Sequence, residues 1–340
     1  MRKIFIIFFL FSFLLSVNAK DGFKKSEDSK NAQKQYYNEL FSAFLIFTDR
    51  NYVEPNFTCK EKNNEITCKA GRNEIVNGIF ASESTFNISS KNGDLDIIQN
   101  HKIDRSNFIF EGYNLSSLLP QNVSCEDKTT LQKLDKKTKT FNESTFCKLD
   151  SNIYKIDFKI IVKHFDPALA KAKNSIDAIN KSYESSKNGD SMLFEIDSIE
   201  FNINSVSLNE VLFDLYKREQ RIANDENSMN DKDYLTKNDD ILFEDYKAFL
   251  QGYYGVLKDL NTKSAPNHKS RADTNYRNLL SALIKIATTP NINVQIKITN
   301  INKTMIAKQD LQNISELSDN FLSIAYKILE NMNIWIRIEY

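Results

Sequence analysis

The chain is poor in the residues that interrupt secondary structure, with 8 glycines and 5 prolines among 340 residues. This composition excludes collagen-like and glycine-rich low-complexity chains and is compatible with long regular strands and helices. Acidic and basic residues balance at 45 each, so the formal net charge is zero. A chain without a basic excess lacks the electrostatic footprint of a nucleic-acid-binding protein. We therefore expect no nucleic-acid partner.

Motifs that mark catalytic sites are missing as well. The sequence contains no G-x-S-x-G nucleophile elbow, no glycine-rich phosphate-binding loop and no H-E-x-x-H metal helix. Segment 225–233 resembles a calcium loop only in its acids, because Met229 and Asn230 stand where a ligand and a glycine are needed. His164 closely precedes Asp166, but a lone histidine at a strand end is typical of a surface or capping residue. We expect a non-enzymatic protein without a cofactor or a bound metal.

A long apolar run occurs only at the start of the chain. Two basic residues precede the apolar stretch 4–16, and the small residue Ala19 follows it. This pattern predicts a secretory signal peptide, residues 1–19, with cleavage before Lys20. A retained membrane anchor is disfavoured because about 13 apolar residues are fewer than the ~20 that span a bilayer. We expect a periplasmic protein, alternatively a secreted or surface-exposed one, whose mature chain has no membrane span.

Cysteine is scarce, and its number and spacing predict disulfides. The chain has four cysteines, and an even number in an exported protein favours disulfide pairing. Of the three pairings that four cysteines allow, we predict the sequential one, Cys59–Cys68 and Cys125–Cys147, because each pair brackets a hairpin-like stretch. Zinc binding is disfavoured because the cysteines lack C-x2-C spacing and the histidines are scattered. A redox-active C-x-x-C is also absent.

Hydrophobic periodicity predicts an α+β protein. We expect a modular, mainly antiparallel, curved sheet with amphipathic helices packed on one face and with local disulfide-bridged hairpins. The predicted modules of the mature chain are an N-terminal amphipathic helix in 20–50, a β-rich module with both disulfides in 51–150, a strand-helix-strand-helix module in 151–235, and a helix-rich module with a terminal strand in 236–340.

The individual elements follow from two periods. Alternation of apolar and polar residues predicts strands at 154–162, 192–204, 292–298 and 334–338. The helical period predicts helices at 29–48, from Asp166-Pro167 to about Tyr183, from Ser207, at 240–260, at 273–288 and at 308–330. The terminal strand is so regular that we expect it to be paired into the sheet.

The hexapeptide SSKNGD occurs twice, at 89–94 and at 185–190. Each copy precedes a strand pattern and then a polar-to-leucine helix start, and a fainter third copy of that pattern lies at 294–306. This recurrence predicts related strand-helix units. The alternative is chance similarity, because Ser, Lys, Asn and Asp are abundant in this chain.

Two groups of side chains are candidates for binding. The first is an apolar and aromatic stripe at helical spacing, which comprises Phe243, Tyr246, Phe249, Tyr253 and Leu257. Such a stripe is typical of core packing, and the alternative is the lining of an apolar-ligand site between helix and sheet. The second is a lysine cluster in the loop of the second cysteine pair, which comprises Lys128, Lys133, Lys136, Lys137 and Lys139. It is interpreted as a solvated hairpin tip or as a basic loop that contacts glycans or lipid head groups.

The segment around the first cysteine pair, NFTCKEKNNEITCKAGRNEIVNGIF (residues 56–80), resembles the C-x8-C segment of the JlpA surface adhesins of Campylobacter. The resemblance covers a minor part of the chain. It implies a curved, partly open β structure with packed helices, a role in binding host or envelope components, and a structural bridge between Cys59 and Cys68. The chain departs from that family because it has no lipobox cysteine.

These observations predict an exported binding protein whose partner is an envelope, glycan, lipid or host component. One alternative is a carrier of a lipid or other apolar ligand in a groove between helices and sheet. That alternative predicts an open cavity beside the stripe 243–257. The other alternative is a cell-surface adhesin, which predicts that the mature protein reaches the cell exterior.

Overall fold

The structure is a computed structural model that describes residues 32–47, 57–76, 79–106, 108–110, 113–133, 139–187, 193–227, 241–252, 270–307 and 328–340. The predicted signal peptide lies outside these residues, as does most of the helix predicted at 308–330.

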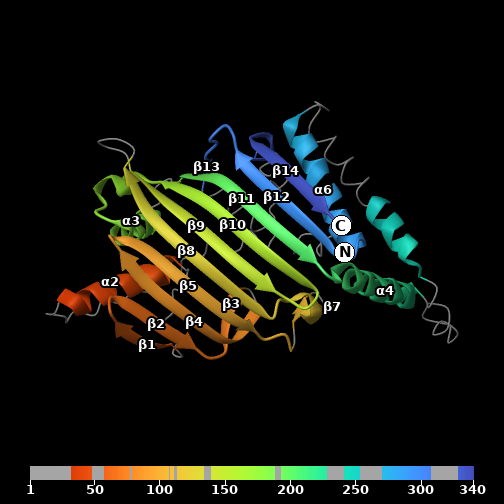
Figure 1. The fold of residues 1–340 in the computed structure, drawn as a ribbon, viewed down its shortest axis with the longest axis horizontal. Helices are drawn as coiled ribbons and strands as arrows, with labels where there is room; N and C mark the ends of the chain where they lie inside the picture. The colour runs from red at the N-terminus through yellow and green to blue at the C-terminus, as the bar shows by residue number, and fades with distance from the viewer. Residues whose placement is uncertain are drawn as a thin grey trace.

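An antiparallel sheet of 12 strands dominates the fold (Figure 1). Its main path follows the chain in the order β1-β2-β4-β5-β8-β9-β10-β11-β12-β14, while β3 pairs with β4 and β13 pairs with β11. The strands are β1 (Thr58–Lys62), β2 (Glu65–Ala70), β3 (Asn73–Val76), β4 (Ile79–Lys91), β5 (Asp94–Ile103), β8 (Asn122–Lys133), β9 (Lys139–Asp150), β10 (Tyr154–Phe165), β11 (Leu193–Ser205), β12 (Ile292–Asn300), β13 (Ile306–Ala307) and β14 (Met332–Glu339). The predicted mainly antiparallel sheet is confirmed.

Helix α2 (Ala32–Phe47) precedes this meander, and the other described helices lie between its strands. These are the short 3-10 helices η1 (Ser116–Leu118) and η2 (Pro167–Lys171), α3 (Ser175–Lys187), α4 (Leu208–Asn227), a helix over 243–252, and α6 (Arg271–Thr288). A separate two-stranded ribbon joins β6 (Ile109–Phe110) to β7 (Tyr113–Asn114). No helix within the described ranges combines the length and the apolar character that crossing a membrane requires.

The strand register gives the sheet one apolar face. Directly opposed residues of an antiparallel sheet point to the same side, and every second residue of a strand does so as well. We call three adjacent cross-strand rows on this side the histidine row (Ala70, Ser84, His101, Val123, Leu149, Ile156, Ile203, Val294, Ile338), the disulfide row (Cys59, Cys68, Phe86, Gln99, Cys125, Cys147, Phe158, Phe201, Ile296, Ile336) and the aspartate row (Ile66, Ile88, Ile97, Asp127, Thr145, Ile160, Ile199, Ile298, Ile334).

The opposite side, which we call the polar face, has a different composition. One of its rows runs through Lys148, Asp157, Asn202, Gln295 and Arg337. The alternation that predicts each strand therefore extends across the whole sheet as two chemically distinct surfaces.

Four hydrophobic cores include residues of the apolar face, and the smallest of them contains Ile103 and contacts Val123. The first joins Phe44 of α2 and Ile176 of α3 to Phe86 of β4, among others. The second joins Leu279 of α6 to Val294 of β12, among others. The third lies mainly on the middle strands, with Cys125, Cys147, Phe158, Ile196 and Ile199, and extends to Ile306 of β13 and Met332 of β14. Burial of the apolar face is thus divided among separate clusters along one continuous sheet.

Both disulfides of the predicted pairing are present. Cys59 is bonded to Cys68 across the β1–β2 hairpin, and Cys125 is bonded to Cys147 across the β8–β9 hairpin. Each bond joins directly opposed residues, with Cα atoms 4.0 and 4.1 Å apart. Both bonds lie in the disulfide row, so each covalently locks the register of one hairpin.

The chain between Asp166 and α3 differs from the single helix predicted there. It forms η2, which the Asp166 carboxylate caps by accepting a hydrogen bond from the Ala168 amide, and then extends at Ala172. A new helix begins after Asn174, whose side chain accepts from the Asp177 amide. The Ser175 amide donates to the Gly93 carbonyl in the β4–β5 turn, so tertiary contact decides where α3 begins.

The predicted terminal strand is confirmed, because β14 pairs with β12 along its whole length. The sheet also continues across the predicted module boundaries, since β9 pairs with β10 and β11 pairs with β12. The two copies of SSKNGD begin in different structures. The copy at 89–94 ends β4 and turns into β5, whereas Ser185 to Lys187 of the second copy end α3 and its remainder lies outside the described residues.

Candidate functional site

A chain of polar side chains crosses the apolar face from β3 to β9. Its members are Asn73, Ser84, His101, Gln99, Asp127 and Thr145. All of them are buried except Gln99, which is partly buried. Each of these strands contributes one or two members. They occupy positions on the apolar face, where other strands of the sheet carry apolar residues. The site is therefore built by strand register and not by a local motif.

Five contacts link these six side chains from one end of the group to the other. The Asn73 amide nitrogen lies 2.9 Å from Ser84 Oγ, which lies 2.7 Å from His101 Nδ1. His101 Nε2 lies 3.4 Å from Gln99 Oε1, and Gln99 Nε2 donates to Asp127 Oδ2 at 2.6 Å. The Thr145 hydroxyl donates to Asp127 Oδ1 at 2.6 Å.

The ionised carboxylate sets the direction of these hydrogen bonds. A carboxylate only accepts, so Gln99 turns its amide nitrogen to Asp127 and its carbonyl to His101. With a hydrogen on Nε2, His101 donates to the Gln99 carbonyl oxygen, and its Nδ1 then accepts from the Ser84 hydroxyl. Bonds aligned in this way polarise one another and end on a charge, which strengthens them.

Asp127 has an unusual proton affinity. Burial raises the pKa of its carboxyl from 3.8 to about 6, although the hydrogen bonds from Thr145 and Gln99 lower it. The neighbouring charges of Glu143 and Glu126 add to the increase. The residue therefore changes charge under mildly acidic conditions, unlike an ordinary aspartate.

A second histidine lies further along the same face. His164 Nε2 lies 2.8 Å from Glu143 Oε2, and the imidazole packs edge-on against Phe141 and Phe194 at centroid distances of 5.2 and 4.9 Å. Glu143 precedes Thr145 by two residues on β9, so its charge faces the Asp127 end of the polar chain. The structure thus brings two acids and two histidines to one side of the sheet.

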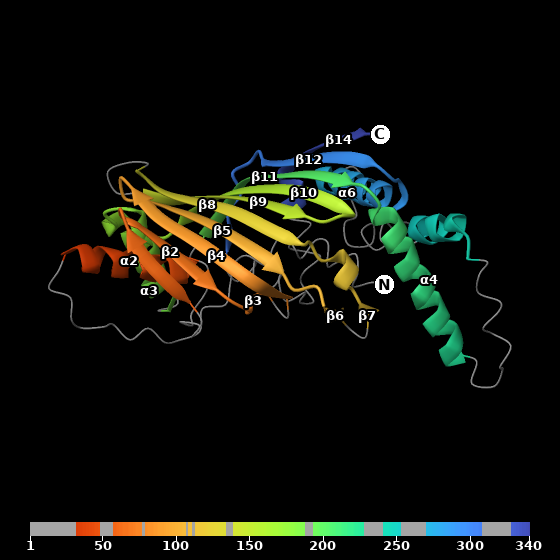
Figure 2. The same ribbon diagram turned by 60° about the horizontal axis from the view of Figure 1, so that its bottom comes forward.

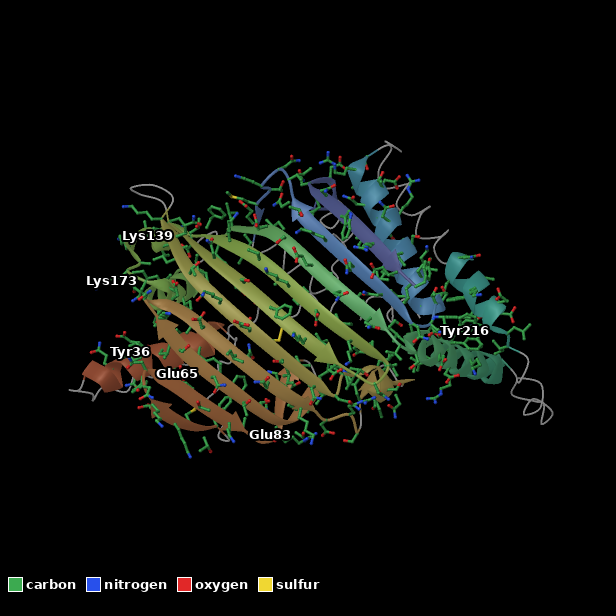
Figure 3. The ribbon with its side chains drawn as sticks, viewed as in Figure 1. Tyr36, Glu65, Glu83, Lys139, Lys173 and Tyr216 are labelled. Carbon is green, nitrogen blue, oxygen red and sulfur yellow. A yellow bond between two sulfur atoms is a disulfide. The ribbon has the colours of Figure 1, made fainter. Side chains whose placement is uncertain are left out.

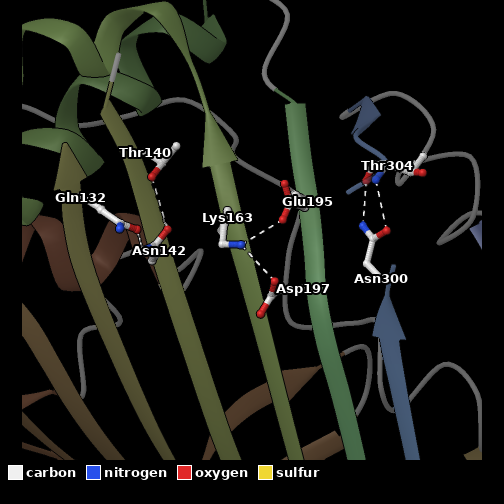
Figure 4. A network of polar contacts seen from close by, with 8 residues as sticks. All are labelled: Gln132, Thr140, Asn142, Lys163, Glu195, Asp197, Asn300 and Thr304. Carbon is white, nitrogen blue, oxygen red and sulfur yellow. Dashed lines mark hydrogen bonds and ion pairs between the residues drawn. The ribbon is translucent and has the colours of Figure 1, made fainter. Parts of the chain in front are cut away.

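A different polar cluster lies on the polar face at a β-bulge (Figure 4). Lys163 Nζ lies 2.9 Å from a carboxylate oxygen of Glu195 and 2.9 Å from one of Asp197. Burial lowers the pKa of Lys163, but the hydrogen bonds to the two acids outweigh it, so the net pKa is raised. This clamp joins β10 to β11 where the register shifts, which is a structural role.

The aromatic stripe, interpreted from the sequence as core packing or alternatively as a ligand lining, lies in a core of its own. Tyr246 is buried, and its ring lies 5.6 Å from that of Phe213 and 5.3 Å from that of Tyr216, both on α4. Burial raises the pKa of the Tyr246 hydroxyl. Phe243 and Phe249 join the same cluster, whereas Tyr253 and Leu257 lie outside the described residues. Ligand binding by the stripe stays a prediction.

The predicted basic cluster lies at the other end of the molecule, as the labels of Lys139 and Tyr216 in Figure 3 show. Lys128 lies 3.9 Å from Asp96, and Lys139 contacts the Ala172 carbonyl oxygen. Lys133 and Lys139 face each other at the end of the β8–β9 hairpin. Lys136 and Lys137 lie outside the described residues. Recognition of glycans or lipid head groups by this loop stays a prediction.

Sequence reasoning missed the polar chain, although a signal was present. Gln99 and Asp127 occupy apolar-face positions of their strands, next to positions held by Ile97 and Cys125. A polar residue at a core position indicates a buried partner. The partner itself lies on another strand, so the pattern alone does not name it.

Within the described residues, no three His, Cys, Asp or Glu side chains form a group able to hold a metal ion. In comparisons with known proteins, the sequence matches no family model and no curated protein.

Proposed function

We propose that this chain is an exported binding protein that holds an apolar ligand on the middle of its apolar face. The signal-peptide pattern and the two disulfides support export, because disulfides persist in oxidising compartments. The single observation that carries the binding role is the partly exposed apolar surface on strands β8 to β12.

Helices on the same face would border this surface on two sides. The apolar-face residues Ile66, Phe86 and Ile97 pack with α2 and α3. The apolar-face residues Ile203 and Val294 pack with α4 and α6. Figure 2 shows α2, α3 and α6 below the sheet in that view. We therefore propose that the helices pack on one face only, in two groups, with the middle strands between them.

The surface between the two groups is apolar and only partly buried. Its partly exposed members, all packed against the third core, are Val123, Leu149, Ile160, Phe201 and Ile298. Leu149, Phe201 and Ile298 also pack against the second core, which borders the surface on the side of α6. Apolar surface that a sheet leaves partly exposed is typical of ligand and partner sites. The polar chain adjoins it at Asp127 and Thr145, which share the aspartate row with Ile160.

The charge of the face favours uncharged ligands over anionic ones. The three named rows of the apolar face contain Asp127 and no lysine or arginine, and Glu143 lies on the same side of β9. An anionic group placed there would meet carboxylates without a compensating cation, which is costly in a poorly solvated site. The proposal therefore specifies a neutral apolar ligand.

The test is a fluorescence titration of the mature chain with N-phenyl-1-naphthylamine, an uncharged probe that becomes bright in apolar surroundings. We expect saturable binding in the wild type. Ile160→Asn, which puts an amide on the proposed surface, should weaken binding on the order of tenfold, because covering a polar amide with an apolar ligand costs free energy of desolvation.

The matched control is Ile161→Asn, since Ile161 is the next residue of β10 and points to the polar face. It should bind the probe as the wild type does. Circular dichroism and thermal melts establish that both variants are folded. Absence of saturable binding, or equal loss in the two folded variants, would refute the proposal.

A further inference from the structure

The two edges of the sheet differ in how well they are protected from pairing with another chain. β1 forms one edge; it carries Lys60, Glu61 and Lys62 and is bonded to β2 by the Cys59–Cys68 disulfide. Charged side chains are the usual protection of an exposed edge. β14 forms the other edge, and among the described strands only β12 pairs with it. Its sequence, MNIWIRIE, contains no lysine, no proline and no bulge.

β14 lies at the margin of the molecule, as Figure 2 shows. Its Trp335 side chain is 49% exposed on the polar face, while Ile334, Ile336 and Ile338 are partly exposed on the apolar face. A long, regular and apolar edge strand is a ready template for strand addition. An exported protein with such an edge is expected to cover it.

Helix α6 holds β14 at both ends. The Asn275 side-chain nitrogen donates to the Met332 carbonyl at 2.8 Å, and Lys285 Nζ lies 3.0 Å from the Tyr340 hydroxyl. The strand is therefore already ordered in the single molecule. A preorganised strand loses little conformational entropy when it associates with a partner.

The sequence of β14 is complementary to itself in one register. When two antiparallel copies meet at Ile336, Ile334 faces Ile338 of the second copy on the apolar side. On the polar side Trp335 faces Arg337, and Asn333 faces Glu339. These are cation–π and hydrogen-bonding partners, and no like charges are opposed. A register two residues later would oppose the two Arg337 side chains, which disfavours it.

We propose that β14 pairs antiparallel with β14 of a second copy of this chain, about a two-fold axis through Ile336. Strand addition of this kind is isologous and closes as a dimer. It joins the two sheets into one, with both apolar faces on the same side. The inference is independent of the proposed ligand-binding function.

Trp335 makes the dimer directly observable, because it is the only tryptophan of the chain. Light scattering on a size-exclusion column should show the mature protein changing from one copy to two across the micromolar range. Over the same range the tryptophan emission should shift to shorter wavelength, and acrylamide should quench it less, because the second copy covers the indole.

Arg337→Glu replaces the cation opposite Trp335 with an acid close to Glu339, so it should raise the dimer dissociation constant at least about tenfold. The matched control is Lys69→Glu, the same charge reversal on the polar face of β2, which should dimerise as the wild type does. Circular dichroism checks that both are folded. A wild-type protein that stays monomeric at every concentration would overturn the proposal. So would a folded Arg337→Glu protein that dimerises as tightly as the control.

Discussion

Asp127→Asn is the most informative single perturbation of the polar chain. The folded state raises the pKa of Asp127 from 3.8 to about 6, and this difference corresponds to about 3 kcal/mol, since each pKa unit is worth 1.36 kcal/mol. A carboxyl with a raised folded pKa binds its proton more tightly in the folded protein. Its favourable contribution is present below pH 3.8 and is lost as the pH rises through about 6.

The variant carries a neutral side chain of the same shape and lacks this pH dependence. We expect the stability of the variant relative to the wild type to fall by about 3 kcal/mol when the pH is lowered from about 7 to about 3. The measurement is urea unfolding of both proteins at several pH values, with the disulfides intact. All other titratable groups are shared, so they cancel in the comparison.

Thr145→Val sharpens the test because it removes a hydrogen bond that favours the charged form of Asp127. The wild-type transition should then move to a higher pH. A stability difference between Asp127→Asn and the wild type that does not change over this pH range would refute the reasoning. It would mean that the carboxyl titrates alike in the folded and unfolded chains.

Two further predictions concern the framework. Replacing Cys125 and Cys147 by alanine should cost roughly 3 kcal/mol of stability, since this bond closes the larger of the two disulfide loops. The melting temperature of this variant should be lower than that of the variant that lacks Cys59 and Cys68. Equal melting temperatures would contradict the prediction. Gly93→Ala should lower the free energy of unfolding by about 1–3 kcal/mol, because Gly93 has φ +85° and an added Cβ would lie 2.6 Å from Asn174 Cβ. Denaturant unfolding measures this loss, and Gly71→Ala is the control because nothing lies within 4 Å of its added Cβ. Equal stabilities of the two variants would count against the reasoning.

Local pattern determined most of the secondary structure. Strands β10, β11, β12 and β14 occur where apolar and polar residues alternate, because burial of one face imposes a period of two on the sequence. The disulfide pairing was also readable, since each cysteine pair brackets one hairpin. Sequence reasoning fails where the same local motif occurs in two structures: the first residues of SSKNGD end a strand in one copy and end a helix in the other.

Tertiary structure alone decided how distant residues meet. Asn73 and Thr145 belong to one hydrogen-bonded chain only because four strand pairings place their positions on one side of the sheet. The aromatic stripe was visible as a stripe, but its neighbours Phe213 and Tyr216 come from α4. A period in the sequence reports which face of an element is buried, because burial acts on each residue separately. The partner across that face depends on strand order and register, which are set by the packing of the whole chain.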